Sequence, residues 1–231
     1  MSPQSISNLG TRLSFNSRLR DHISANLAGL DLRRIDTTGK KHAAVAITLT
    51  NCNANADIGD IPFSEAGSEL AAFILTIRAT KLKHHAGQRA FPGGRIDTGE
   101  TPEQTALREL MEEVGLRLDA RSILGKLDDY ATRSGFVITP VVVWGGTDLN
   151  LTANPGEVES IHRIPVSELL RGDSPILESI PESDNPVIKM PLGNDWFAAP
   201  TAAIAYQFRE VAILGKNTRV AHFEQPLFAW K

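Results

Sequence analysis

The 231-residue chain contains a single cysteine, Cys52, so no disulfide can form within it. No apolar run reaches the roughly 18 residues that suggest a membrane span, and the start MSPQSISNLGTRLSF lacks the apolar segment of a signal peptide. The net charge is −3, which argues against a general nucleic-acid binder, because such proteins need a sustained basic surface. These absences predict a cytoplasmic protein that binds neither membranes nor nucleic acid.

What the chain does contain is enough apolar sequence for a full core. Hydrophobic residues make up 42% and charged residues 22%, so a single domain over residues 1–231 is the default expectation. We divide it into an N-terminal helix at about 11–30, a core at about 41–170 and a C-terminal extension of strand and helix at about 186–231. The N-terminal helix could cap the sheet or pack against another subunit, which leaves open a monomer or a homodimer.

The pattern of apolar residues predicts a mixed α/β fold. Runs rich in apolar and β-branched residues predict strands at 43–50, 70–77, 136–144 and 158–164. Pro140 should force a bulge or an edge position. We expect a short helix near 166–170, a surface excursion over 171–185, and a helix over 202–214 that Gly215 ends.

The most informative segment reads GRIDTGETPEQTALRELMEEVGL over residues 94–116. Thr101 can cap a helix whose first residue is Pro102, and Gln104 completes a capping box. Gly115 can end the helix in a left-handed conformation. The segment therefore predicts a loop followed by a helix of about thirteen residues.

This helix has an apolar stripe and an acidic patch. The stripe repeats every four residues, at Ala106, Leu110 and Val114. The patch is formed by three glutamates at i, i+3 and i+4: Glu109, Glu112 and Glu113. Like charges this close repel, so the patch calls for a cation, and hard oxygen ligands suit Mg²⁺ or Mn²⁺. The alternative is a solvated acidic face on which Arg108 pairs with Glu112.

The same segment fits the pattern G-x5-E-x7-R-E-U-x-E-E-x-G-U, with U an apolar residue, at every fixed position. It resembles the Nudix box, the loop–helix motif of hydrolases that cleave nucleoside diphosphates linked to another moiety. The resemblance implies an α/β/α sandwich with a mixed sheet around this motif. It implies that Arg108 orients the glutamates, and that Glu109 is a candidate to activate water. The implied metal ligands are the carbonyl of Gly93, Glu109, Glu112 and Glu113.

A basic stretch precedes the box. Residues 70–96 hold no acidic residue and carry five fixed positive charges, at Arg78, Lys81, Lys83, Arg89 and Arg95. This polarity suits a polyanionic ligand, because the cations can hold outer phosphates while a metal acts on the phosphates that are cut. The alternative is a solvated basic loop after a strand.

The spacing within this stretch is similar to LLTxRSxxLxxHxGxxxFPGGxxD, the signature of coenzyme A pyrophosphatases, a Nudix subfamily. Ile74 for leucine and Ala79 for serine are mild departures, and residues 198–202 read AAPTA where many members have W-G-x-T-A. The resemblance implies hydrolysis of coenzyme A or acyl-coenzyme A to 3′,5′-ADP and 4′-phosphopantetheine or its acyl form. Charge and spacing make five residues candidates for substrate binding: Arg78, Lys81, Lys83, His85 and Arg89.

Two carboxylates outside the box are further candidates for the general base. Glu157 and Glu159 lie in a segment that resembles the subfamily's N-P-x-E-V motif, and two positions apart on a strand they would face the same side. A base outside the box would add about 10²–10⁴-fold to the rate. The alternative is a pair of exposed strand carboxylates.

Two other functions stay open. The first is a Nudix pyrophosphatase for another nucleoside diphosphate derivative, such as ADP-ribose, NADH or an oxidised dNTP. The tyrosine or proline landmarks of the dinucleoside-polyphosphate and ADP-ribose subfamilies are missing at residues 131–134, and the SQPWPFPxS array of NADH pyrophosphatases is absent. The second is a non-catalytic Nudix-fold sensor of a nucleotide. Such proteins usually lose box glutamates, and this chain keeps them.

Overall fold

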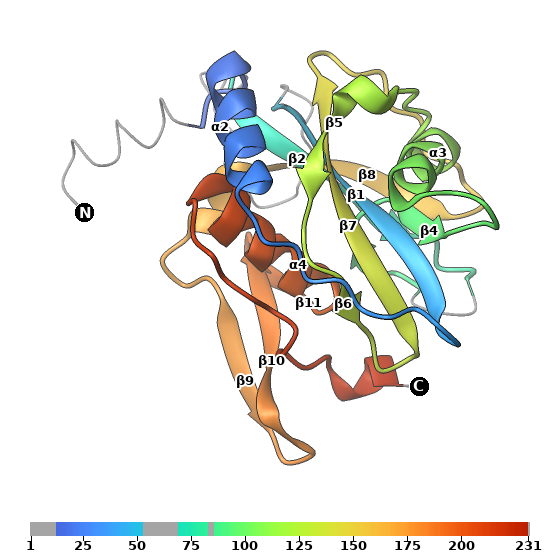
Figure 1. Ribbon diagram of the computed structural model, residues 1–231, viewed down its shortest axis with the longest axis vertical. Helices are drawn as coiled ribbons and strands as arrows, with labels where there is room; N and C mark the ends of the chain where they lie inside the picture. Colours follow the sequence, from blue (N-terminus) through green and yellow to red (C-terminus); the bar gives the residue numbers. More distant parts are fainter. Residues whose placement is uncertain (1–12, 53–68, 83–85, 231) are drawn as a thin grey trace.

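The computed structural model describes residues 13–52, 69–82 and 86–230. Within them, eight strands form one mixed sheet with the order β3-β2-β1-β7-β5, while β8 pairs with β2, β4 with β1 and β6 with β7 (Figure 1). The pair β1–β7 is parallel and the other pairs are antiparallel. The strands are β1 (Lys41–Asn51), β2 (Ala71–Arg78), β3 (Arg89–Ala90), β4 (Gly93–Arg95), β5 (Ile123–Lys126), β6 (Tyr130–Ala131), β7 (Phe136–Gly146) and β8 (Val158–Pro165).

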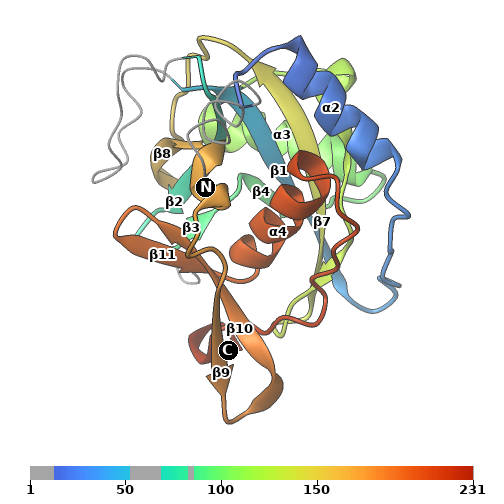
Figure 2. The ribbon, with the colours of Figure 1, turned by 90° about the vertical axis from the view of Figure 1, so that its left-hand side faces the viewer.

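Helices cover both faces of this sheet (Figure 2). On one face lies α3 (Pro102–Val114), which packs on a cluster containing Ala44, Ala46, Ile74, Val141 and Val143. On the other face lie α2 (Ser17–Ala28) and α4 (Thr201–Phe208), within a larger apolar cluster. The predicted α/β/α sandwich is thus confirmed. In the described part of the chain, no helix is both long and apolar enough to cross a membrane.

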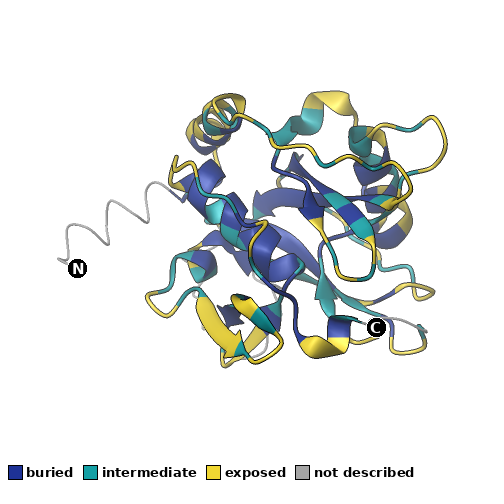
Figure 3. Ribbon diagram, turned by 60° about the horizontal axis from the view of Figure 1, so that its bottom comes forward, coloured by how far each residue is buried: buried dark blue, intermediate teal, exposed yellow. Residues whose placement is uncertain are grey.

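A smaller antiparallel sheet, ordered β11-β10-β9, lies beside α4. The expected surface excursion over 171–185 is confirmed, since none of its residues is buried, and the segment contains a strand and the beginning of the next. The strand β9 is mostly exposed (Figure 3), and Pro175 and Pro181, which indicate a loop in the sequence, flank it. The three strands are β9 (Ile176–Ile180), β10 (Ser183–Leu192) and β11 (Asp195–Ala198).

Most other predicted elements are confirmed with small shifts. The N-terminal helix is α2, which is shorter than the expected 11–30. Its side chains Leu19, Ile23 and Leu27 are buried in the larger apolar cluster. The helix expected over 202–214 is α4 followed by a π-helical turn at Arg209–Ile213. Among the described residues there are also three short 3₁₀ helices, η2 (Ala120–Ser122), η3 (Val166–Leu170) and η5 (Leu227–Trp230).

The expectation that Pro140 forces a bulge or an edge position is wrong. It lies in β7, an interior strand, and the register with β1 runs unbroken through it. The amide of Leu127 donates to the carbonyl of Pro140 at 3.0 Å. The backbone of Pro140 therefore faces the edge of β7 that pairs with β5 and β6, at the gap between these two strands. The missing N–H of proline falls at this gap, where it interrupts no ladder.

Candidate active site

The loop–helix segment folds as its sequence predicts. The amide of Gln104 donates to the hydroxyl of Thr101 at 3.2 Å, and the amide of Thr101 donates back to the Gln104 side chain at 2.8 Å. Gly115 ends α3 with a φ of 71°, a conformation that favours glycine. The predicted stripe of Ala106, Leu110 and Val114 is fully buried. Packing of this stripe on β1 and β7 fixes which face of α3 carries the glutamates.

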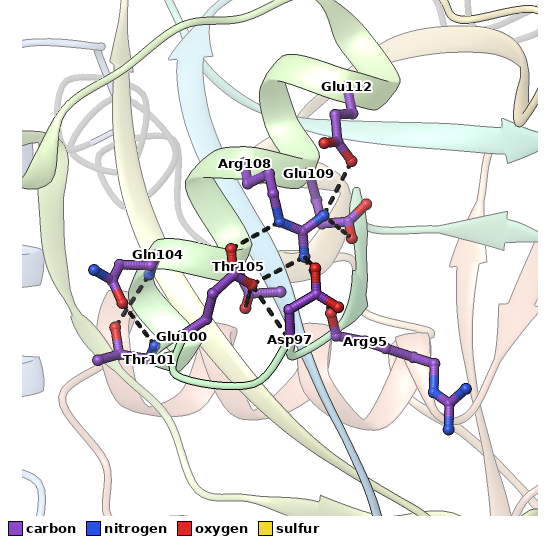
Figure 4. Close-up of polar contacts among 9 residues, drawn as sticks. All are labelled: Arg95, Asp97, Glu100, Thr101, Gln104, Thr105, Arg108, Glu109 and Glu112. Atoms are coloured by element: carbon purple, nitrogen blue, oxygen red, sulfur yellow. Dashed lines mark hydrogen bonds and ion pairs between the residues drawn. The ribbon is translucent and has the colours of Figure 1, made fainter.

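Arg108 holds the acidic residues of this segment together (Figure 4). Its guanidinium donates to both carboxylate oxygens of Glu100, at 2.9 and 3.0 Å. It also donates to Glu109 at 2.9 Å and to Glu112 at 3.0 Å, and to the main-chain carbonyl of Arg95 at 3.1 Å. All five N–H groups of the guanidinium are thereby used. That Arg108 orients the glutamates stays a prediction, which these contacts support for Glu109 and Glu112.

Glu100 is the anchor of this network. Hydrogen bonds from Arg108, and then one from the hydroxyl of Thr105 at 2.7 Å, lower the pKa of Glu100 from 4.5 to about 2. The same pairing, above all with Glu100, raises the pKa of Arg108. The sequence pattern includes Glu100, but nothing in the pattern predicts that its carboxylate pairs with Arg108, eight residues later in the chain.

Glu109 and Glu113 are buried, so the alternative of a solvated acidic face does not describe them. Burial raises the pKa of Glu109, and it raises the pKa of Glu113 to about 7. Arg78 opposes the shift at Glu113, with its Nη1 3.8 Å from Oε1. The amide of Gly93 donates to the other oxygen at 3.2 Å. Glu112 differs from these two, because 53% of its side chain is exposed.

The two glycines before the helix make room for the carboxylates. A Cβ at Gly94 would lie 2.1 Å from Oε1 of Glu109, and a Cβ at Gly93 would lie 2.4 Å from the carbonyl oxygen of Ala44. Neither position could take a side chain without movement of its neighbour. Close approach of β4 to β1 on one side and to α3 on the other therefore requires this glycine pair.

The glutamates do not form a finished metal site in their present positions. Among the residues that the structure describes, no three His, Cys, Asp or Glu side chains are grouped so that they could hold an ion. Glu112 is turned to Arg108, and Glu113 is held by Gly93. The donor chemistry still fits Mg²⁺ or Mn²⁺, because carboxylate oxygens are hard ligands and Glu109 shares its cation, Arg108, with Glu100 and Glu112. Metal-ligand roles for Gly93, Glu109, Glu112 and Glu113 stay predictions.

The three described residues among the predicted basic candidates for substrate binding lie in three different places. Arg78 ends β2 beside Glu113, whereas Lys81 is exposed in the following turn. Arg89 points to the small sheet, where it donates to Asp195 at 2.7 Å. Lys83 and His85 lie outside the described residues.

The structure distinguishes Glu157 from Glu159. Both are exposed, but β8 begins at Val158, so Glu157 lies in the turn before the strand and the expectation of a shared strand face is wrong. After burial and nearer charges, Glu157 adds to the raised pKa of both Glu109 and Glu113. The backbone of Glu157 is tied to the basic stretch, because its carbonyl accepts from the amide of Ala79 at 2.9 Å.

A cavity of about 280 Å³ adjoins these groups. Arg78, Gly93 and Gly94 form the side next to the carboxylates. Apart from Arg89, sequence reasoning did not assign the rest of its lining to the site, because no local pattern connects segments so far apart in the chain. These residues include Arg95, Thr132, Ser134, Phe136, Thr201 and Gln225.

Comparison with known proteins gives a consistent result. Residues 61–182, more than half of the chain, match the model of the NUDIX domain. The chain is 39% identical over 102 residues to Nudix hydrolase 3 of Caenorhabditis elegans, a match that covers 42% of each protein. It is 41% identical over 99 residues to an uncharacterized Nudix hydrolase, NudL, of Klebsiella pneumoniae, with 42% of this chain and 52% of that protein covered. The chain thus spans about half the length of these relatives.

A solved structure extends the likeness to the whole fold. The crystal structure of a MutT/nudix family protein from Enterococcus faecalis aligns with 90% of this chain and 74% of its own, with a TM-score of 0.50. The two sequences are 17% identical over this alignment. At that identity the likeness concerns the fold, and it agrees with the sandwich described above.

Proposed function

This chain belongs to the NUDIX domain family, and from that premise we propose that it is a metal-dependent pyrophosphohydrolase of coenzyme A or acyl-coenzyme A. Its products would be 3′,5′-ADP and 4′-phosphopantetheine or the acyl form of the latter. The observation that carries the proposal is the position of Arg78, 3.8 Å from Glu113. Arg78, a cation of the basic stretch that resembles the coenzyme A pyrophosphatase signature, thus lies beside a carboxylate of the box. A diphosphate bound between cations and metal ligands would require such an arrangement.

The residues that would hold Mg²⁺ or Mn²⁺ are the carbonyl of Gly93 and the carboxylates of Glu109, Glu112 and Glu113. When bound, the ion would supply charge neutralisation at the phosphoryl oxygens and a lowered pKa of coordinated water. Glu112 is the residue best able to turn toward an ion, because it is exposed and its partner Arg108 keeps four other hydrogen bonds.

The chain's own residues would do the remaining work. Arg108 keeps Glu109 fixed by a hydrogen bond, while Glu100 keeps Arg108 fixed in turn. Arg78 would bind a phosphoryl oxygen, a role that suits its partly exposed guanidinium. Glu109 and Glu157 are the candidates for taking a proton from the attacking water. Lys81, Lys83, His85 and Arg89 would contact the outer parts of the substrate.

The test is a substrate panel assayed with Mg²⁺ and with Mn²⁺. It holds coenzyme A, acetyl-coenzyme A, ADP-ribose, NADH, diadenosine tetraphosphate and oxidised dGTP. We expect the two coenzyme A compounds to have the highest kcat/KM, and Glu112→Gln to abolish turnover of both. Glu103→Gln is the matched control, because Glu103 lies on the same helix but pairs with Lys126 away from the patch.

Each alternative gives a different result in this panel. A higher kcat/KM for ADP-ribose, NADH or oxidised dGTP would replace coenzyme A by that substrate while retaining the hydrolase. No turnover of any compound with either metal would favour the nucleotide sensor. A kcat of Glu112→Gln within threefold of wild type would show that the glutamate patch is not the catalytic site.

A further inference from the structure

A second cavity lies beside the one at the box. It measures about 170 Å³ and shares four lining residues with the first: Gln88, Arg89, Pro200 and Thr201. The hydroxyl of Thr201 donates to the carbonyl of Arg89 at 3.2 Å, so β3 and the start of α4 are fastened together where the cavities meet. Figure 2 shows α4 and β11 near β3. The two cavities are therefore adjacent, and we refer to them together as the trough, with its near end at Gly93 and Gly94 and its far end at Trp196 and Phe228.

The far part of this trough is lined by two exposed aromatic side chains. Trp196 is 39% exposed and Phe228 is 59% exposed. Lys189 covers the Trp196 ring from 4.0 Å, which leaves the rest of the indole for contact with a ligand. Exposed aromatic residues that line a cavity are typical of sites for ligands with flat or apolar parts. Both residues lie beyond residue 182, outside the part of the chain that matches the NUDIX domain.

The charges along the trough favour a neutral ligand in its far part. Arg89 stands at the junction of the cavities, but Asp195 accepts from its guanidinium at 2.7 Å. Arg78, which lines the near end, lies 3.8 Å from Glu113 of the box. An anionic group is therefore best placed at the near end, whereas an additional phosphate at the junction would have to compete with Asp195.

We propose that this trough binds the linear, amide-containing arm of the substrate, with its phosphate end at the box and its thiol or acyl end against Trp196 and Phe228. The inference rests on the proposed function, because it assigns one of the two halves of coenzyme A to these cavities. Amide planes and methylene groups can pack on aromatic faces. The nucleotide half then extends from the other side of the diphosphate.

The experiment measures binding of the two halves separately, by calorimetry and by tryptophan fluorescence. The probes are 4′-phosphopantetheine, its S-hexanoyl form and 3′,5′-ADP, each added to the full chain. We expect both pantetheine probes to change the fluorescence, and Trp196→Phe to remove that change. Phe228→Ala should weaken binding of the S-hexanoyl form about three- to tenfold, as expected for one lost aromatic contact. Leu177→Ala is the control, since Leu177 is similarly exposed on β9 but lines neither cavity.

Three results would overturn the assignment. The first is a fluorescence change caused by 3′,5′-ADP alone that Trp196→Phe removes. The second is binding of the pantetheine probes that Trp196→Phe and Phe228→Ala leave unchanged. The third is no binding of these probes to the wild-type protein. Failure of the proposed function is a separate observation, because it appears as absent hydrolysis of coenzyme A. Hydrolysis without any Trp196 response would refute this inference alone. A Trp196 response without hydrolysis would refute the function alone.

Discussion

The main-chain amide of Asn154 donates to the carbonyl of Glu113 at 2.9 Å. A second bond of the same length, from Thr152 to Val114, fastens the same loop to the end of α3. Glu157 follows three residues after Asn154 and accepts a main-chain hydrogen bond from Ala79. The loop before β8 therefore holds Glu157 near the buried glutamates by main-chain contacts with both the helix and the basic stretch.

From this arrangement we expect Glu157→Gln to lower kcat about 10²-fold or more, as loss of a general base does. Glu159→Gln should leave kcat within twofold of wild type, because the anchored loop positions Glu157 and not Glu159. The two variants are matched controls for each other, since both residues are exposed and lie two positions apart. The measurement is kcat across a pH series at saturating metal. Wild-type rates for both variants would leave Glu109 as the better candidate for the base.

Gly94 gives a second prediction. Gly94→Ala would place a methyl carbon 2.1 Å from Oε1 of Glu109, far closer than van der Waals contact allows. The carboxylate must move, and a displaced catalytic group costs about 10- to 100-fold in kcat. The free energy of unfolding should fall by about 2 kcal/mol or less, because a side-chain end can yield.

The control for this variant is Gly172→Ala. A Cβ there would meet no atom within 4 Å, and the backbone of Gly172 is not left-handed. It should therefore change neither kcat nor the unfolding midpoint. Full activity of Gly94→Ala would show that the position of Glu109 does not limit the rate.

The sequence alone predicts the parts of the site that depend on neighbouring residues. The capping of α3 and the grouping of its glutamates follow from spacing, because residues three and four apart share a helix face. The pairing of Arg108 with Glu112 is of this kind. The burial that distinguishes Glu109 from Glu112 does not follow from spacing, because it depends on where α3 lies on the sheet.

The parts that the sequence does not predict are contacts between distant segments. Arg78 reaches Glu113 only because the fold brings the end of β2 beside α3. Asp195 reaches Arg89 from β11, a strand that the sequence does not connect to the site. The cavity lining combines β3, β7 and α4. Neither hydrophobic periodicity nor capping residues indicate such packing, so these residues can be identified only from the fold.

The Glu100–Arg108 pair predicts how stability depends on pH. Hydrogen bonds from Arg108 and Thr105 lower the pKa of Glu100 from 4.5 to about 2, so the unfolded chain binds this proton more tightly than the folded chain. The stabilisation is fully present above about pH 4.5 and is lost as the pH falls toward 2. We expect the midpoint of thermal unfolding of Glu100→Gln to lie below that of wild type at pH 7.

The difference between these two proteins should shrink steadily as the pH is lowered from about 5 toward 2, because wild-type Glu100 then becomes protonated and neutral like the glutamine. The measurement is thermal unfolding by circular dichroism at each pH. A constant difference over this range would mean that the carboxylate of Glu100 does not owe its stabilising effect to its charge.

The last prediction separates two roles within the basic stretch. Arg78 lies 3.8 Å from Glu113, whereas Lys81 is exposed three residues later in the chain. If Arg78 contacts the diphosphate, its substitution removes that contact both from coenzyme A and from 3′-dephospho-coenzyme A. A contact from Lys81 to the 3′-phosphate would be lost with coenzyme A alone. Each lost charge-assisted hydrogen bond costs about 1.5–3 kcal/mol, or roughly 10- to 100-fold in kcat/KM.

We therefore expect Arg78→Gln to lower kcat/KM for both substrates by a similar factor, and Lys81→Gln to lower it for coenzyme A until the two substrates are equal. Comparison within each variant removes any general effect on folding or metal affinity, because both substrates meet the same protein. If wild-type protein already has equal kcat/KM for the two substrates, nothing in the basic stretch recognises the 3′-phosphate. The substrate would then be a broader class of ADP-linked diphosphates, since the interaction that distinguishes coenzyme A from them would be missing.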